Sequence, residues 1–169
     1  MTTAKPFLKW AGGKRQLLNE LEANFPPHIL ETKEIDLYIE PFVGGGALFF
    51  YLLSNYCVKK SIINDINPDL MLTYKVIKLF PEELIKRLEV IQTEYLRLDT
   101  EKRKEYFYNK LREPYNKLKI NYKKKDKKSW VEKSALLIAL NKTCFNGLYR
   151  QNSKGEFNVP VGRYKNPKI

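Results

Sequence analysis

The sequence predicts an α/β fold: a partial Rossmann-like sheet followed by an inserted, mainly helical lobe that carries a β-hairpin. Three observations predict it. A strand pattern, a glycine-rich turn, an apolar helix pattern and a second strand follow one another over residues 35–64, which is the order of a βαβ unit. Helical patterns then dominate residues 69–142. A polar, aromatic and glycine-punctuated segment covers residues 145–167, called here the C-terminal run.

Residues 5–14 are expected to form a loop that leads into a helix. Paired glycines and a proline within residues 5–14 favour a loop. Leucines at positions 17, 18 and 21 then share one helical face. Because proline lacks the amide that a helix interior needs, Pro26-Pro27 is expected to end this helix.

The βαβ unit is expected to consist of the strand Ile35–Ile39, a helix and the short strand Ser61–Asn64. Gly44-Gly-Gly-Ala opens the helix, which is apolar nearly all round through Leu53 and is therefore expected to be buried. A helix between two strands predicts parallel pairing and a right-handed crossover.

After Pro68 the pattern becomes helical. Helices are expected over residues 69–79, from Pro81 onward, over 101–119 and over Trp130–Lys142, with Asn121–Lys128 as a basic loop. The apolar faces are expected to hold Leu84, Leu88, Ile91, Tyr95, Leu136, Leu137 and Leu140. We therefore expect two domains, residues 1–68 and 69–169, with a hairpin near 148–164.

Charge indicates the class of partner. The chain has 169 residues, a net charge of +12 and a pI near 9.6, which favours a polyanion such as DNA, RNA or an anionic membrane surface. A solvated basic surface is the alternative. Seven of the lysines crowd residues 117–128, the lysine-rich segment.

Other features of the sequence narrow the class of protein. No apolar stretch reaches transmembrane length, and the N-terminus lacks the apolar segment of a secretory signal. Cys57 and Cys144 lack metal-ligand spacing. These features predict a cytoplasmic protein with reduced thiols, no bound metal and no membrane partner.

Glu40-Pro-Phe-Val-Gly-Gly-Gly-Ala47 is a candidate cofactor turn at the strand-to-helix junction. Glycines let the backbone approach a ligand, and a helix N-terminus favours negative charge. Asp65 follows after roughly 20 residues, at the end of the next strand, where an acid can bind ribose hydroxyls. The spacing is not Gly-x-Gly-x-x-Gly, so it suits nucleotide-like cofactors generally, and a turn without a ligand is the alternative.

Lys9-Trp10-Ala-Gly-Gly-Lys14 is a second candidate. Trp10 can cover an adenine or a sulfonium, and Lys14 can meet a carboxylate. Trp10 as an ordinary core residue is the alternative.

The C-terminal run is a candidate nucleic-acid surface. Asn146-Gly147 and Lys154-Gly155 are turn signals, and Val159, Val161 and Tyr164 suit flanking strand. Arginine can bind guanine with two hydrogen bonds, asparagine can bind adenine, and apolar side chains can wedge between bases. The residues with this chemistry are Phe145, Asn146, Leu148, Tyr149, Arg150, Asn152 and Arg163. Contact with phosphate alone, or with nothing, is the alternative.

Taken together, these motifs resemble the Dam-type, or D12 class, N6-adenine-specific DNA methyltransferases. Lys9–Lys14 is similar to the family's N-terminal cofactor motif and Glu40–Gly46 to its glycine-rich motif. Residues 141–167 resemble its target-recognition region, most densely in Asn146-Gly-Leu, Gly155-Glu-Phe-Asn-Val-Pro160 and Gly162-Arg-Tyr-Lys165.

The resemblance implies S-adenosylmethionine as cofactor and double-stranded DNA, most commonly GATC, as substrate of a bacterial or phage protein that is monomeric when complete. The cofactor residues would be Trp10, Lys14, Glu40, Phe42, Gly44, Gly46 and Asp65. Asn146, Arg150, Pro160 and Arg163 fall where the family contacts bases and flanking backbone, and Phe145 where it places an aromatic that fills the stack after base flipping.

The family's catalytic motif, Asp-Pro-Pro-Tyr, does not occur in the sequence. Asn67-Pro68-Asp69 and Glu113-Pro114-Tyr115 are near-matches that do not follow the C-terminal run, and we reject both. We therefore expect the chain to stop before its catalytic half, to lack methyl transfer alone and to be marginally stable. Leu37, Ile39, Ile62 and Ile63 should then lack sheet neighbours on one side.

The residues are also compatible with two other functions. A non-catalytic, sequence-specific DNA-binding module would keep the C-terminal run without the chemistry. A nicotinamide-dependent oxidoreductase is suggested only by Gly44–Gly46 together with Asp65.

Overall fold

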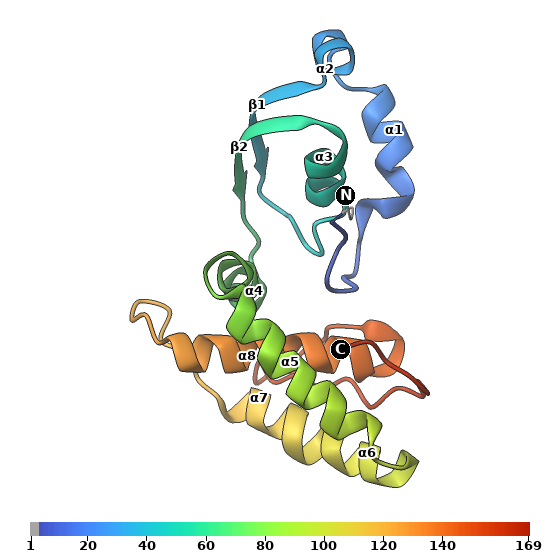
Figure 1. Ribbon diagram of the computed structural model, residues 1–169, viewed down its shortest axis with the longest axis vertical. Coiled ribbons are helices and arrows are strands. Elements are labelled where there is room, and N and C mark those ends of the chain that lie inside the picture. The colour runs from blue at the N-terminus through green and yellow to red at the C-terminus, as the bar shows by residue number, and fades with distance from the viewer. Residues whose placement is uncertain (1–3) are drawn as a thin grey trace. The chain divides into compact units, whose positions relative to one another are not determined.

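The computed structural model describes residues 4–169 and divides them into two compact units. Unit 1 comprises the described residues up to Ile66, and unit 2 comprises Asn67–Ile169. Figure 1 draws unit 1 with the strands and unit 2 with the long helices. Among the described residues, no helix combines the length and apolar character needed to cross a membrane.

Unit 1 is built around one βαβ element. Strands β1 (Glu34–Glu40) and β2 (Cys57–Ile63) form a two-stranded parallel sheet, in which Ile39 pairs with Ile62 and Glu40 with Ile63. The connecting helix is α3 (Ala47–Asn55). The predicted parallel pairing is confirmed, and both strands are longer than expected.

The helices before the sheet differ from the prediction. Short helices η1 (Lys14–Leu17) and α1 (Leu18–Ala23) end before the two prolines, and a second helix, α2 (Pro27–Thr32), begins at Pro27. The prediction that no helix continues through Pro26-Pro27 is confirmed, but helix α2 was not predicted. Proline is also well tolerated at the first helical position, where no amide hydrogen bond is needed.

Unit 1 encloses a small core. Ile35, Leu52 and Tyr56 are buried together, and Tyr38 stacks on Phe49 of α3. Leu52 is the one buried residue of α3, so the prediction of a buried helix was wrong. A two-stranded sheet is too narrow to cover a helix that is apolar on several sides.

The sheet also leaves apolar side chains uncovered, as the sequence predicts. Leu37, Ile39 and Ile62 are 49%, 58% and 47% exposed. Unpaired strand edges and exposed apolar side chains are features of a sheet that lacks neighbouring strands.

Unit 2 packs its helices around α8. Its elements are α4 (Pro68–Leu79), α5 (Pro81–Leu96), α6 (Thr100–Tyr106), the π-helical segment η2 (Phe107–Arg112), α7 (Glu113–Lys117), α8 (Lys127–Thr143) and η3 (Phe145–Gly147). Helices α4, α5 and α7 all contact α8 (Figure 1). Twelve of the 17 residues of α8 are buried, so α8 is the central element of this core.

Two details of unit 2 correct the prediction. The expected charged helix over 101–119 is three successive segments, whose residues Phe107, Leu111 and Tyr115 are fully buried at four-residue spacing. The C-terminal run folds back on itself without strands: it holds only the antiparallel bridges Cys144↔Val161 and Gln151↔Phe157. The expected strand over Val159–Tyr164 is absent. This segment instead makes separate main-chain contacts near the end of α8, where the Phe145 amide donates to the Pro160 carbonyl and the Gly162 amide donates to the Thr143 carbonyl.

Candidate functional site: a glycine turn and an anchored C-terminal run

The glycine-rich turn joins the carboxyl ends of both strands. Val43 donates its amide to the Asn64 carbonyl at 2.9 Å, and Asn64 donates to the Glu40 carbonyl at 2.8 Å. Asp65 Oδ2 accepts the Gly44 amide at 3.0 Å. The acid predicted from the sequence is therefore fastened directly to the turn that leads into α3.

Trp10 packs against this turn so closely that glycine is required at Gly44. The backbone there has φ +51°, and a Cβ would lie 3.0 Å from Trp10 Cδ1. At Gly45 a Cβ would lie 3.1 Å from the Leu8 carbonyl oxygen. The two sequence motifs of unit 1 thus form one structure, although Lys14 and Glu40 are 26 residues apart.

Lys14 fixes the other side of the turn. Its Nζ donates to Glu40 Oε1 and to the Phe42 carbonyl, both at 2.9 Å. The Tyr38 hydroxyl donates to Glu40 Oε2 at 2.7 Å. Burial and the Glu40 carboxylate raise the pKa of Tyr38, so its hydroxyl remains a donor.

Glu40 is 5% exposed, so its charge is compensated mainly by Lys14. The carboxylate that Lys14 meets is therefore one of the chain's own. Tyr38 was missed from the sequence; its signal is its place two residues before Glu40 on the same strand. The Phe42 side chain, by contrast, is 71% exposed while its carbonyl is bound.

The C-terminal run begins with a tight turn after α8. Asn146 has φ +54°, a left-handed conformation that asparagine tolerates better than most residues. The Asn141 side chain donates to the Gly147 carbonyl at 2.8 Å, and Phe145 donates its amide to the Pro160 carbonyl at 2.9 Å. The turn presents Phe145 and Leu148, which are 51% and 44% exposed.

The return of the run to α8 depends on Gly162. Its amide donates to the Thr143 carbonyl at 2.8 Å, and a Cβ there would lie 2.8 Å from the Cys144 carbonyl oxygen. Arg163 follows directly and is exposed. Residues from both ends of the run, Phe145, Pro160 and Arg163, are thereby collected near the end of α8.

The tip of the run forms a second group. Arg150 Nε donates to Asn158 Oδ1 at 3.0 Å while the residue stays exposed. The Asn152 side chain is used inside the tip: Oδ1 accepts the amides of Lys154 and Glu156, and Nδ2 donates to Glu156 Oε2. Asn152 shapes this loop and is less available to an outside partner than Arg150.

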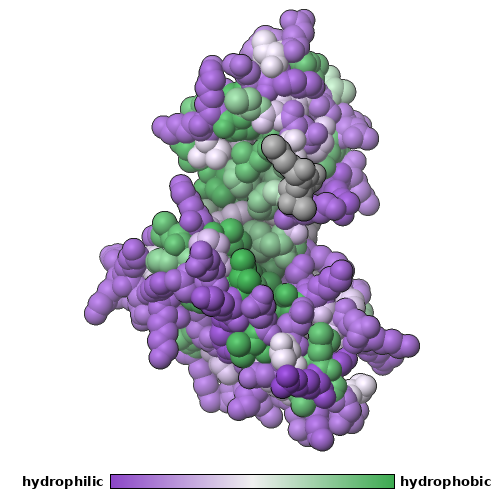
Figure 2. Space-filling model, viewed as in Figure 1, coloured by the Kyte–Doolittle hydropathy of each residue, from purple (hydrophilic) through white to green (hydrophobic). Residues whose placement is uncertain are grey.

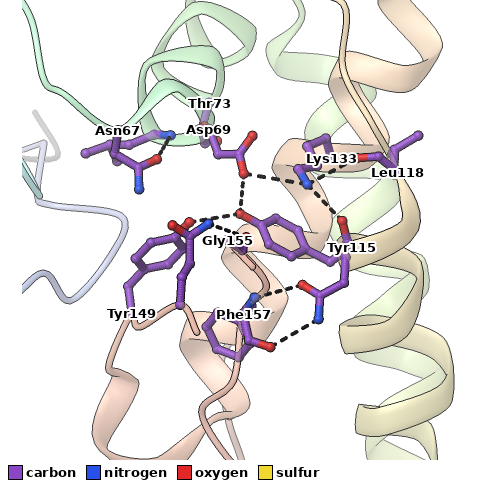
Figure 3. A network of polar contacts seen from close by, with 12 residues as sticks. Asn67, Asp69, Thr73, Tyr115, Leu118, Lys133, Tyr149, Gly155 and Phe157 are labelled. Atoms are coloured by element: carbon purple, nitrogen blue, oxygen red, sulfur yellow. Dashed lines mark hydrogen bonds and ion pairs between the residues drawn. The ribbon is translucent and has the colours of Figure 1, made fainter. Parts of the chain in front are cut away.

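Helix α7 anchors the tip. Asn116 binds both main-chain groups of Phe157: its Oδ1 accepts the Phe157 amide at 2.8 Å and its Nδ2 donates to the Phe157 carbonyl at 3.1 Å. The Phe157 ring is buried edge-on against Tyr115. Figure 3 shows this pair of hydrogen bonds beside the Tyr115 ring.

The buried carboxylate of Asp69 binds the Tyr115 hydroxyl and so extends this group of contacts. Asp69 Oδ2 accepts the Tyr115 hydroxyl at 2.6 Å and lies 3.5 Å from Lys133 Nζ. Asp69 Oδ1 accepts the Tyr122 hydroxyl at 2.6 Å. The Tyr115 hydroxyl also lies 3.3 Å from that of Tyr149 in the C-terminal run. The network joins α4, α7, α8 and the run in one polar cluster.

Lys133 completes this cluster inside the core. Its Nζ donates to the carbonyls of Tyr115 and Leu118 at 2.8 and 3.2 Å. Burial lowers the pKa of Lys133, and the charge of Asp69 partly offsets that effect. Asp69 and Tyr115 come from the two rejected near-matches, so those sequences have a structural role that their resemblance to a catalytic motif does not reveal.

Comparison with known proteins identifies the family of the chain. The D12 class N6 adenine-specific DNA methyltransferase family matches residues 10–169. Type II methyltransferase M.MjaIII of Methanocaldococcus jannaschii is 57% identical over 98% of this chain and 54% of its own length. DNA adenine methylases of Serratia marcescens and Escherichia coli are 36% and 33% identical, over 99% of this chain and 52% and 51% of their lengths.

The chain thus spans about half the length of the curated relatives it matches. The match includes Trp10, the glycine-rich turn, the anchored C-terminal run and the helices between them. The chain belongs to the D12 class N6 adenine-specific DNA methyltransferase family.

Proposed function

We propose that the chain provides the S-adenosylmethionine-binding and DNA-recognising parts of a site-specific adenine N6-methyltransferase that acts on double-stranded GATC in the cytoplasm. The observation that carries the proposal is the glycine turn closed by Asp65 and covered by Trp10. The relatives named type II methyltransferase support a restriction-modification role, and a solitary regulatory methylase is the alternative. The neighbouring gene would distinguish these roles.

The residues of unit 1 fit a nucleoside cofactor. S-adenosylmethionine supplies a methyl group on a sulfonium. Asp65 stands at the end of the second strand, where an acid binds ribose hydroxyls, and the Gly44–Gly46 turn lets a ligand approach the backbone. Trp10 offers an aromatic face to an adenine or a sulfonium. The observed pairing of Lys14 with Glu40 supports a positioning role for this lysine, which holds the turn in place.

The exposed residues of the C-terminal run fit a duplex. The guanidinium groups of Arg150 and Arg163 suit guanine edges, and the Asn146 amide suits adenine. Phe145 and Leu148 are exposed apolar side chains on a backbone that hydrogen bonds fix in place. That is the requirement for a wedge that enters a base stack when the target base leaves it. Pro160 contributes its carbonyl to this support.

We further propose that these 169 residues do not transfer a methyl group by themselves. The exocyclic nitrogen of adenine has its lone pair delocalised into the ring. Hydrogen bonds from that amino group to a carboxylate or amide and a backbone carbonyl would direct it toward the methyl group. Asp-Pro-Pro-Tyr, which would supply those acceptors, is absent from the sequence. The second candidate is a non-catalytic, sequence-specific DNA-binding module, and an in-frame Asp-Pro-Pro-Tyr after codon 169 would argue against it.

The test is calorimetric titration of the 169-residue chain with S-adenosylmethionine and, separately, with NAD. We expect the chain to bind S-adenosylmethionine but not NAD. The substitution Asp65→Ala should weaken the affinity for S-adenosylmethionine at least tenfold. The matched control is Asp36→Ala, which removes an exposed carboxylate of β1 that pairs with Lys59. Binding of NAD, or equal affinity of the Asp65→Ala and wild-type chains, would contradict the proposal.

A further inference from the structure

The lysine-rich segment concentrates charge that the candidate site does not use. Residues 117–128 contain seven lysines and one aspartate, a net charge of +6 and half of the chain's +12. Lys117 pairs with Glu113, and Lys127 pairs with Glu83. The other five lysines are exposed and form no ion pair with an acid among the described residues: Lys119, Lys123, Lys124, Lys125 and Lys128.

This segment surrounds a hollow of about 560 Å³. The lining includes Lys119, Lys124, Lys125 and Lys128, together with the buried Trp130. Figure 1 shows the segment as the loop between α7 and α8, and Figure 2 shows hydrophilic side chains projecting at that side of unit 2. The charged residues of the lining are five lysines and Asp126, so the concave surface has a net positive charge and concentrates anionic ligands.

Several contacts hold the segment on the core of unit 2. The Tyr122 hydroxyl donates to Asp69, the carboxylate that also accepts Tyr115. Asp126 caps α8 by accepting the Ser129 amide and hydroxyl. The Lys127 ammonium lies 5.2 Å from the centre of the Phe80 ring. The lysines are therefore presented from a supported loop, whose position relative to the C-terminal run is set by the Asp69 network.

The chemistry of the segment favours phosphate over base edges. A lysine ammonium is a compact point charge without the planar fork that reads guanine, and residues 117–128 contain no arginine. Closely spaced ammonium groups match the repeated negative charges of a duplex backbone. We infer that the lysine-rich segment is a phosphate-binding surface that adds sequence-independent affinity for DNA, separate from base recognition by the C-terminal run. The inference rests on the proposed function, since it takes the duplex as the ligand.

The test compares two triple variants of the 169-residue chain. Lys124→Gln, Lys125→Gln and Lys128→Gln together remove three charges from the segment. Lys86→Gln, Lys104→Gln and Lys110→Gln remove three exposed charges from the helical surface of the same unit. Fluorescence anisotropy with a labelled 20-base-pair duplex without GATC gives the dependence of affinity on salt, and circular dichroism checks that each variant is folded.

We expect the segment variant to lower the slope of log affinity against log salt by about 2.7, or about 0.9 for each phosphate that the protein no longer neutralises. Its affinity should fall by about the same factor for a GATC duplex, because phosphate contacts carry no sequence information. The helix variant should keep the wild-type slope. An unchanged slope in the segment variant, or an equal change in both variants, would overturn the inference.

Two further outcomes separate this inference from other accounts. Failure of the wild-type chain to bind any duplex would refute the proposed function itself, whereas a wild-type duplex complex with an unchanged slope refutes only the phosphate surface. Sedimentation with vesicles of equal parts phosphatidylserine and phosphatidylcholine tests the other polyanion. Vesicle binding that the segment variant loses while its DNA slope stays at the wild-type value would assign the lysines to a membrane and overturn the inference.

Discussion

Unit 1 and unit 2 differ in how their functional segments are fixed. In unit 2 the C-terminal run is tied to a buried core: Phe157 and Val159 are almost fully buried, and Asn116 binds the main chain of Phe157. In unit 1 the glycine turn is held by hydrogen bonds to other residues of the same unit, such as the one from the Gly44 amide to Asp65. Leu37 and Ile39 of the adjoining strand stay exposed. A site can therefore be locally ordered on an incompletely covered sheet.

The difference follows from secondary structure. A helix such as α8 can be surrounded by its neighbours in sequence, because short connections bring antiparallel helices together. A parallel strand depends on partners from distant parts of a chain. Unit 2 thus assembles a closed core from about 100 consecutive residues, whereas two strands and one crossover helix cannot bury both faces of a sheet.

The largest expected effect tests this contrast in burial directly. Leu140→Ala, in the last turn of α8, removes a fully buried side chain and should lower the free energy of unfolding by about 3–5 kcal/mol. Ile39→Ser, on the exposed face of β1, should change it by less than about 0.5 kcal/mol. Urea unfolding followed by circular dichroism measures both. Similar losses would mean that the face of β1 is covered in solution.

Asp69→Ala tests the polar part of the unit 2 core. The substitution leaves the buried Lys133 ammonium and the Tyr115 hydroxyl without their carboxylate. We expect a loss of about 3 kcal/mol, near the low end for a broken buried pair, because Lys133 keeps two carbonyl partners. Asp36→Ala, which removes an exposed carboxylate of unit 1, should leave the urea midpoint nearly unchanged. A midpoint for Asp69→Ala equal to wild type would show that the cluster is hydrated.

Asn116→Ala sharpens the account of how the core positions the run. It removes both hydrogen bonds to the Phe157 main chain and should cost about 1–2 kcal/mol. The Phe157 amide should exchange with deuterium faster than in the wild-type chain. Asn109→Ala, at an exposed position of η2, serves as the control. Equal protection of Phe157 in both variants would place the anchoring in the apolar contacts alone.

The smallest expected effect concerns how the stability of unit 1 depends on pH. Hydrogen bonds from Tyr51 and then Tyr56 hold the pKa of Glu22 below its ordinary value of 4.5. A carboxyl whose folded pKa is lowered stabilises the folded state above its unfolded pKa, and this stabilisation is lost as pH falls through the folded pKa. Stability of unit 1 should therefore decline below about pH 4.5.

Glu22→Gln should make that decline shallower, measured as the urea midpoint of tyrosine fluorescence between pH 3 and pH 7. Tyr51→Phe, which keeps the carboxyl but removes its first hydrogen bond, should do the same in part. A Glu22→Gln profile that superimposes on the wild-type profile would exclude this contact as a source of acid sensitivity.

The sequence predicted elements where one local signal dominates. The βαβ unit was confirmed because β-branched strands flank a glycine turn, and the buried positions Leu84, Ile91 and Tyr95 of α5 follow helical spacing. The exposed face of the sheet was predicted from the small number of strands. Helix α2 was missed because Pro27 is compatible with both the end of one helix and the start of another.

Long-range polar contacts could not be predicted. Asp69 and Tyr115 are 46 residues apart, and Lys133 belongs to a residue type that is usually exposed. Asn116 lies in a strongly charged stretch, so its pairing with Phe157 has no sequence signal. The cofactor and DNA residues were chosen by motif, and their contacts with ligands stay a prediction.

Selection from a pool of random duplexes tests the central claim, that the anchored C-terminal run reads DNA sequence. The 169-residue chain is incubated with the pool, bound duplexes are recovered and sequenced, and the procedure is repeated with Arg150→Ala. The account predicts enrichment of GATC by the wild-type chain and weaker discrimination at one base pair, by about 1–3 kcal/mol, for the variant. Enrichment of no sequence by the wild-type chain would contradict it.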